Sequence, residues 1–273
     1  MAITDALPEM GRELKFYPAV NDNPKKLTQA QIQEFNEKGC LFPLDVFTPE
    51  EAEANRIYFE KLMDMTSAAG RNNYSITGWH RSCAGIYDLL MDDRILDYVE
   101  DLLGENLVSR MTHYFAKMPD DGKTVAWHQD ASYWPLTPSK TVTVWLAIDD
   151  ASIENSAMEV VPGSHVHGQI AFDKSKPEEN NVLNQSVNNA EQFGEPVALE
   201  MKAGQISIHS DLLLHGSKPN ASDRRRCGLT LRYMPPEVRT KETDHSPAVI
   251  CRGSDPSGYW QHMPRPEGDA VPS

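Results

Sequence analysis

Apolar residues recur at helical spacing over residues 27–106 and at strand spacing after them. Thr28 and Gln31 have the spacing of a capping box, and Gly39 is a natural end for the helix that they open. Thr48 and Glu51 repeat this start signal. The predicted helices cover residues 28–38, 48–67 and 84–103, with a short strand at 40–44 and a loop at 70–82.

From Leu107 the pattern changes to short apolar, β-branched runs separated by turn residues, which is typical of a sandwich or barrel. The predicted strands cover residues 107–118, 141–148, 158–161, 196–201, 205–209, 212–216 and 226–233. Residues 165–195 are polar and Asn-rich, and a loop of this length is usually a lid or a binding element. Helices first and strands later indicate an α+β fold, mainly β, with helices packed against an antiparallel double sheet.

The length of 273 residues fits one large domain. We expect an N-terminal arm at 1–26, helical support at 27–106, a β core at 107–236 and a C-terminal tail at 237–273. The net charge of -14 disfavours nucleic acid and anionic membranes as partners, and argues mildly against a large polyanionic substrate.

The four cysteines are scattered and form no Cys-x-x-Cys motif, so we expect free thiols and a cytoplasmic protein. No signal peptide and no apolar run of about 20 residues is evident. The oligomeric state is not indicated.

The candidate chemistry centres on His128 and Asp130, in the stretch Trp127-His128-Gln129-Asp130. Side chains at i and i+2 of an extended chain share one face, so an imidazole and a carboxylate could bind one metal ion. The pair alone is also common as a hydrogen-bonded surface couple. A third ligand has to come from another segment, and the candidates are His215, His209 and His165. Two histidines and one carboxylate are the ligands expected of non-haem Fe(II) oxygenases.

Three consecutive arginines, Arg224, Arg225 and Arg226, precede the last predicted strand. The alternation of side chains along a strand distinguishes Arg226 from Arg225. It places four residues on one face of the strand: Arg226, Gly228, Thr230 and Arg232. An inward guanidinium needs an anionic partner, either a cosubstrate carboxylate or a nearby acid in a structural ion pair. Gly228 beside Arg226 would leave room for such a ligand. Lys117 is expected to be exposed, as most lysines are.

Taken together, these motifs resemble the phytanoyl-CoA dioxygenase family of Fe(II)/2-oxoglutarate oxygenases. The motifs that carry the resemblance are His128-Gln129-Asp130, Trp145, Pro162-Gly163-Ser164-His165, His215-Gly216-Ser217, Asn220 and Arg226. They fall in the expected order and spacing, within a similarity from about Leu27 to Pro236 that is diffuse elsewhere. The resemblance implies a double-stranded β-helix, a jelly-roll and cupin-like core, with the N-terminal helices packed against its sheets.

The resemblance also assigns roles. It implies an iron site of His128, Asp130 and His215, because the eleven-residue step from His215 to Arg226 matches the family. Arg226 would hold the distal carboxylate of 2-oxoglutarate, with O2 as the second cosubstrate. Further candidate cosubstrate contacts are Trp145, His113 and Ser217, of which the first two could equally be core residues.

The implied reaction hydroxylates an unactivated C–H bond of a small molecule and releases succinate and CO2. Halogenating relatives replace the carboxylate at the position of Asp130, so we expect hydroxylation rather than halogenation. Desaturation, epoxidation or cyclisation by the same iron chemistry are alternatives, as is a catalytically silent jelly-roll protein that binds a metabolite. Candidate substrate contacts are Tyr74, Trp79, Tyr133, Trp134 and Arg232, and the identity of the substrate is not indicated.

Overall fold

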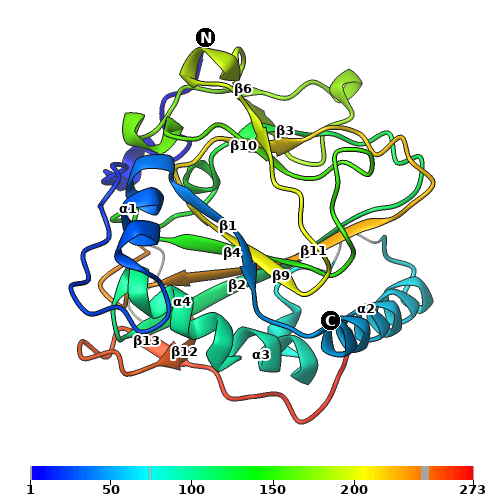
Figure 1. The fold of residues 1–273 in the computed structure, drawn as a ribbon, viewed down its shortest axis with the longest axis horizontal. Helices are drawn as coiled ribbons and strands as arrows, with labels where there is room; N and C mark the ends of the chain where they lie inside the picture. The colour runs from blue at the N-terminus through cyan, green and yellow to red at the C-terminus, as the bar shows by residue number, and fades with distance from the viewer. Residues whose placement is uncertain (1, 73, 75, 241–245, 273) are drawn as a thin grey trace.

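The computed structural model describes residues 2–72, 74, 76–240 and 246–272. Two β-sheets face each other, and helices cover the outer face of the larger sheet (Figure 1). The helices are α1 Gln29–Lys38, α2 Pro49–Ala68, α3 Ala84–Leu90 and α4 Asp93–Leu103. The predicted arrangement of helices against a double sheet is therefore confirmed.

The larger sheet has seven strands in the order β1-β9-β4-β11-β2-β12-β13. Their bounds are β1 Cys40–Asp45, β9 Gln205–Ser210, β4 Val142–Ala147, β11 Arg226–Met234, β2 Leu107–Lys117, β12 Ser246–Arg252 and β13 Trp260–His262. Neighbouring strands are antiparallel, except β12 and β13, which are parallel. Strands from both sides of residues 107–236 thus extend the sheet beyond the range predicted for the β core.

The smaller sheet has the order β3-β10-β5-β8, with β3 Val125–His128, β10 His215–Ser217, β5 Glu159–Val160 and β8 Val197–Ala198. Apolar side chains from both sheets form a common cluster that includes Trp145, Val160 and Leu213. The predicted strand at 212–216 begins only at His215, because Leu213 belongs to a turn in which its N–H donates to Ser210 O.

Short elements fill the connections. A third, two-stranded sheet pairs β6 Asp173–Lys174 with β7 Gln185–Ser186 inside the predicted loop 165–195. The 3-10 turns are η1 Pro8–Met10, η3 Trp79–Arg81, η4 Asp130–Ser132, η5 Ser164–His167, η6 Pro177–Glu179 and η7 Ala190–Phe193.

The helix starts follow the predicted capping chemistry. In α1 the Thr28 side chain accepts from the Gln31 N–H and the Gln31 side chain accepts from the Thr28 N–H. Thr48 and Glu51 do the same at α2. Gly39 ends α1 at a φ of 78°, a conformation that glycine adopts without steric cost.

The single helix predicted at 84–103 is wrong, because the chain breaks between α3 and α4 at Met91 and Asp92. The Asp92 side chain accepts from the Arg94 N–H and so starts a new helix. The carbonyl of Leu90, which would serve an unbroken helix, instead accepts from the Tyr233 hydroxyl at 2.9 Å. A tertiary hydrogen bond therefore stabilises a break that the apolar period alone does not reveal.

The N-terminal arm wraps the body of the protein. Ile3 pairs with Phe172, the residue before β6. Figure 1 marks the N-terminus at the same end of the molecule as β6. Arg12 donates to the carbonyls of Ala131 and Trp134 at 2.6 and 2.7 Å. The arm thus supports residues that follow the His128–Asp130 motif. In the described part of the chain, every helix is too short or too polar to cross a bilayer.

His80 in η3 has no exposed surface, and its Nδ1 lies 3.0 Å from Thr112 Oγ1. Burial lowers the pKa of His80 to about 4. The unfolded chain therefore binds more protons than the folded protein between pH 4 and the ordinary value of about 6.5. The free energy of unfolding should fall as the pH decreases through this window.

We predict that His80→Gln reduces the pH dependence of the free energy of unfolding between pH 7.5 and 4.5 by about 2 kcal/mol. Urea unfolding at the two pH values measures the difference, and a constant loss of packing cancels from it. His167→Gln, at an exposed histidine, is the matched control. An unchanged pH dependence in His80→Gln would contradict this account.

Candidate active site

Two histidines lie opposite each other on neighbouring strands of the smaller sheet. His128 ends β3, His215 begins β10, and the two residues are direct partners in the antiparallel register. Each Nδ1 lies close to the carbonyl oxygen two residues earlier, at 2.8 Å from Ala126 O and 2.9 Å from Leu213 O. With Nδ1–H donating to that carbonyl, each Nε2 carries the lone pair and is free to bind a metal.

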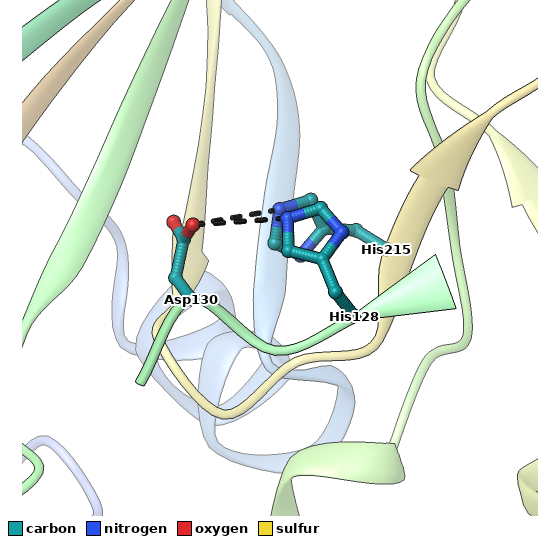
Figure 2. A group of neighbouring side chains, drawn as sticks. All are labelled: His128, Asp130 and His215. Atoms are coloured by element: carbon teal, nitrogen blue, oxygen red, sulfur yellow. Dashed lines mark ion pairs between the residues drawn. The ribbon is translucent and has the colours of Figure 1, made fainter. Parts of the chain in front are cut away.

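Asp130 completes the group. Its Oδ1 lies 3.9 Å from the Nε2 atoms of both His128 and His215, and Figure 2 shows the carboxylate opposite the two rings. Strand β3 ends at His128, and Asp130 opens η4. Gln129 is nevertheless extended, at φ -114° and ψ 133°, so the two side chains still share one face.

Gln129 points away from this group and ties down the surrounding loops, a role that sequence reasoning missed. Its Nε2 donates to Gly168 O at 2.8 Å and to Leu212 O at 2.6 Å. Its Oε1 accepts from the Ile170 N–H at 2.7 Å. The alternation that aims His128 and Asp130 inward therefore also anchors the start of the 165–195 segment to the turn before β10.

The electrostatics keep all three groups in the protonation state that a metal requires. Burial raises the pKa of Asp130, but the charge of Arg232 and the side chain of His209 outweigh it, and this pKa lies well below its usual range. Thr143 Oγ1 also donates to Asp130 Oδ2 at 2.8 Å. Burial lowers the pKa of His128, and lowers that of His215 further, so both rings stay neutral at neutral pH.

The donor atoms of His128, Asp130 and His215 all lie within 4.8 Å of one another, and this is the group of potential metal ligands found among the described residues. Of the two rival histidines, His165 is buried elsewhere, with Nε2 3.1 Å from Asn36 O. His209 lies beside the group, its Nε2 3.8 Å from Asp130 Oδ2. Two imidazoles and a carboxylate with one side open suit Fe(II).

Arg226, at the start of β11, lies at the other end of the site and is 2% exposed. Its guanidinium donates to Ser156 O at 2.9 Å, Phe115 O at 3.4 Å and Ser217 Oγ at 3.2 Å. Within the described ranges it forms no ion pair with an acid.

Its two neighbours behave differently. Arg225 pairs with Asp149 at 2.8 Å, and Arg224 pairs with Glu154 at 2.7 Å. The predicted alternation therefore holds, and it leaves Arg226 as the arginine of the three whose charge is buried without an acidic partner among the described residues.

A cavity of about 40 Å³ connects the two ends of the site. Its lining includes His128, Asp130 and His215, the metal group, and also Thr143, Trp145, His209, Ser217, Arg226, Thr230 and Arg232. The space expected beside Gly228 is filled by the indole of Trp145, because a Cβ added at Gly228 would lie 1.9 Å from its Cζ2. Glycine is required there by the ring, which lies 5.7 Å from the Arg226 guanidinium.

Lys117 is not exposed as expected but buried, with 1% of its surface accessible. It is the direct cross-strand partner of Arg226, and its Nζ donates to Ser156 Oγ, Ser217 O and Lys218 O. Burial, assisted by the charge of Arg226, lowers the pKa of Lys117 to about 7. Arg226, together with the protonated fraction of Lys117, thus makes this end of the site attractive to an anion. The alternation of β2, which puts residue 117 on the face of residues 113 and 115, was the signal that could have revealed it.

We predict that Lys117→Met lowers the free energy of unfolding by about 1 to 3 kcal/mol, because the carbonyls of Ser217 and Lys218 each lose a donor and the hydrogen bond to Ser217 O is buried. Since one of these carbonyls belongs to Ser217, the partner of Arg226, binding of an anion at Arg226 should weaken as well. Urea unfolding and anion titration measure the two effects. Lys202→Met, at an exposed lysine, is the control, and equal stability of the two variants would contradict the prediction.

The other predicted residues divide into two groups. Tyr133, Trp134 and Arg232 lie together and line a second cavity next to the metal group. Three other predicted residues line neither cavity. Trp79 is 1% exposed and belongs to the core under the helices. The Tyr74 hydroxyl donates to Asp121, and His113 Nε2 lies 3.0 Å from Tyr74 O.

Comparison with known proteins places this geometry in a family. The model of the phytanoyl-CoA dioxygenase (PhyH) family matches residues 35–228. The chain belongs to this family. A Dictyostelium discoideum protein described as a phytanoyl-CoA dioxygenase domain-containing protein 1 homolog is 30% identical over 207 residues, covering 75% of this chain and 67% of that protein.

Two further relatives are informative. The "Probable alpha-ketoglutarate-dependent hypophosphite dioxygenase" of Stutzerimonas stutzeri is 32% identical over 152 residues, covering 54% of this chain and 52% of that protein. The solved structure of the non-heme monooxygenase ThoJ is 28% identical with a TM-score of 0.74, covering 87% of this chain and 88% of that one. The match spans about half the length of several PhyH relatives. The predicted family and jelly-roll fold are confirmed.

Proposed function

We propose that this PhyH-family protein is an Fe(II)/2-oxoglutarate-dependent dioxygenase that hydroxylates an unactivated C–H bond of a small molecule. One observation carries the proposal. Two free Nε2 atoms and a carboxylate converge at one end of a cavity, and a buried arginine without an acidic partner in the described ranges lies at the other. A metal ion and a dianionic cosubstrate would satisfy both ends together.

In this proposal His128, Asp130 and His215 hold the iron. Arg226 binds the distal carboxylate of 2-oxoglutarate, and the hydroxyl of Ser217, already within 3.2 Å of the guanidinium, adds a hydrogen bond. Trp145 forms the apolar wall along the cosubstrate. His113 does not line this cavity and is separated from Trp145 by β11, so any contact that it makes with the cosubstrate is proposed to be weak. Bound there, iron and 2-oxoglutarate with O2 would supply the chemistry that oxidises the C–H bond, giving succinate and CO2.

The surrounding residues orient the proposed metal ligands and exclude water from the site. The carbonyls of Ala126 and Leu213 fix the tautomer and the ring direction of the two histidines. Thr143 and the fixed backbone of Gln129 orient the carboxylate of Asp130. The segment that Gln129 anchors, residues 165–195, is proposed as the lid that excludes water from the site. Because Asp130 supplies a carboxylate where halogenating relatives have none, hydroxylation is the proposed outcome.

We predict that His128→Ala and His215→Ala each weaken Fe(II) binding by more than about 100-fold, because partners that merely orient a ligand are already worth roughly 10- to 100-fold. Calorimetric titration under argon measures the affinity. His209→Gln should keep most of the affinity, because His209 is not a proposed ligand. Loss of binding in His209→Gln with retention in His215→Ala would overturn the choice of the third ligand.

We predict that Arg226→Gln raises the apparent KM for 2-oxoglutarate by roughly 10- to 100-fold, because a charge-assisted pair of hydrogen bonds is lost. Succinate formation at varied 2-oxoglutarate measures this, and mass spectrometry of the product should show one added oxygen. Arg224→Gln, which removes an exposed ion pair, is the matched control. An unchanged KM in Arg226→Gln would contradict the assignment.

A further inference from the structure

A second cavity, of about 230 Å³, opens beside the metal group, and Arg232 lines both cavities. Three of its lining residues are arginines, Arg81, Arg110 and Arg232. None of the described residues that line it is acidic, although the whole chain has a net charge of -14. The positive charge of this lining is therefore opposite in sign to the net charge of the protein, and it is a specific feature of this cavity.

The three arginines differ in depth. The Arg232 side chain is the deepest, with 10% of its surface exposed, Arg110 is half-buried, and Arg81 is exposed. Arg81 Nη2 donates to Arg110 O at 3.3 Å, which holds the outer arginine beside the next one. A graded row of guanidinium groups that leads toward a metal site would steer an anion inward.

Arg232 is short of partners for a buried charge. Its Nη2 lies 3.8 Å from Asp130 Oδ1, and the Trp134 ring lies 4.9 Å from its guanidinium. Its Nε is buried with no hydrogen-bond partner among the described residues. The Trp134 ring fixes the plane of the guanidinium but does not neutralise it.

The one acid beside Arg232 is also the carboxylate of the metal group. When a divalent cation binds there, the charge of Asp130 is shared with the metal, and Arg232 needs another anion. The open side of Arg232 faces the larger cavity, where a ligand carboxylate or phosphonate could accept two parallel hydrogen bonds.

We propose that the substrate is a small organic oxyanion whose charged group is bound by Arg232 at the inner end of this cavity. This proposal rests on the proposed function, because it names the substrate class of the same site. Arg110 and Arg81 guide the anion inward. Because Arg232 adjoins Asp130, the carbon that is oxidised lies close to the charged group.

The rest of the cavity limits the carbon skeleton. Its walls include apolar side chains from Met111, Trp134, Leu136 and Met234. Ligand pockets for drug-sized molecules are roughly 300 to 1,000 Å³, so a cavity of about 230 Å³ suits a smaller molecule. A short, mainly apolar chain with one oxyanion group matches both the size and the lining.

Matched ligands test the charge requirement. The probes are butanoate, propylphosphonate and propanesulfonate, each compared with butanamide. In the Ni(II)-loaded protein, at least one anion should raise the midpoint of thermal unfolding in a dose-dependent way, at a concentration at which butanamide has no effect. The three anions distinguish carboxylate, phosphonate and sulfonate recognition.

Variants test the residue. Arg232→Gln should weaken the affinity for the preferred anion by at least roughly tenfold, whereas the apparent KM for 2-oxoglutarate should change by less than about twofold. Arg232→Lys should recover part of the affinity, because it restores the charge without the fork. Arg56→Gln, at an exposed arginine of α2, should match the unchanged protein.

The outcomes separate the two proposals. Anion binding at Arg232 without succinate formation under any condition would overturn the dioxygenase function and keep the anion site. Succinate formation with butanamide binding as tightly as the anions would overturn the anion proposal and keep the function. A rise in the KM for 2-oxoglutarate alone in Arg232→Gln would place Arg232 at the cosubstrate and also overturn the proposal.

Discussion

The site depends on the antiparallel register between β3 and β10. This register places His128 opposite His215, and both rings then need only a backbone carbonyl to fix their direction. A shift of one residue in either strand would turn one imidazole to the other face of the sheet. Two contacts stabilise this register. Gln129 donates to the turn before β10, and Gly216 packs against the backbone of β3, where a side chain would collide.

The second constraint is the burial of charge. Asp130, Arg226 and Arg232 line one cavity, and Lys117 is buried beside Arg226. Buried charges without partners destabilise a fold, so these residues lower the stability of the protein in return for a site that can bind charged ligands. The two cationic ends differ in kind, because Arg226 and Lys117 adjoin neutral oxygens whereas Arg232 adjoins the carboxylate of Asp130.

Local chemistry made much of the fold predictable. Capping boxes at Thr28 and Thr48 marked two helix starts, and the period of two in β11 separated Arg226 from Arg225. The choice of His215 needed the family resemblance, because His209 also lies beside Asp130.

Features that depend on contacts between distant segments were not predictable. The break between α3 and α4 involves a hydrogen bond from Tyr233. Alternation along β2 could have indicated the face on which Lys117 lies, but the carbonyls that accept from its Nζ come about a hundred residues later. The same holds for Gly228, whose neighbour Trp145 comes from another strand.

The N-terminal arm has a consequence for the order of assembly. Its residues are synthesised before the segments that they contact, because Ile3 pairs with Phe172 and Arg12 donates to the carbonyls of Ala131 and Trp134. Such distant pairings carry an entropic cost of chain closure, and they cannot form until about half of the chain exists. The support that Arg12 gives to Trp134, which lines the second cavity, is therefore completed only after the segment around Trp134 has been synthesised.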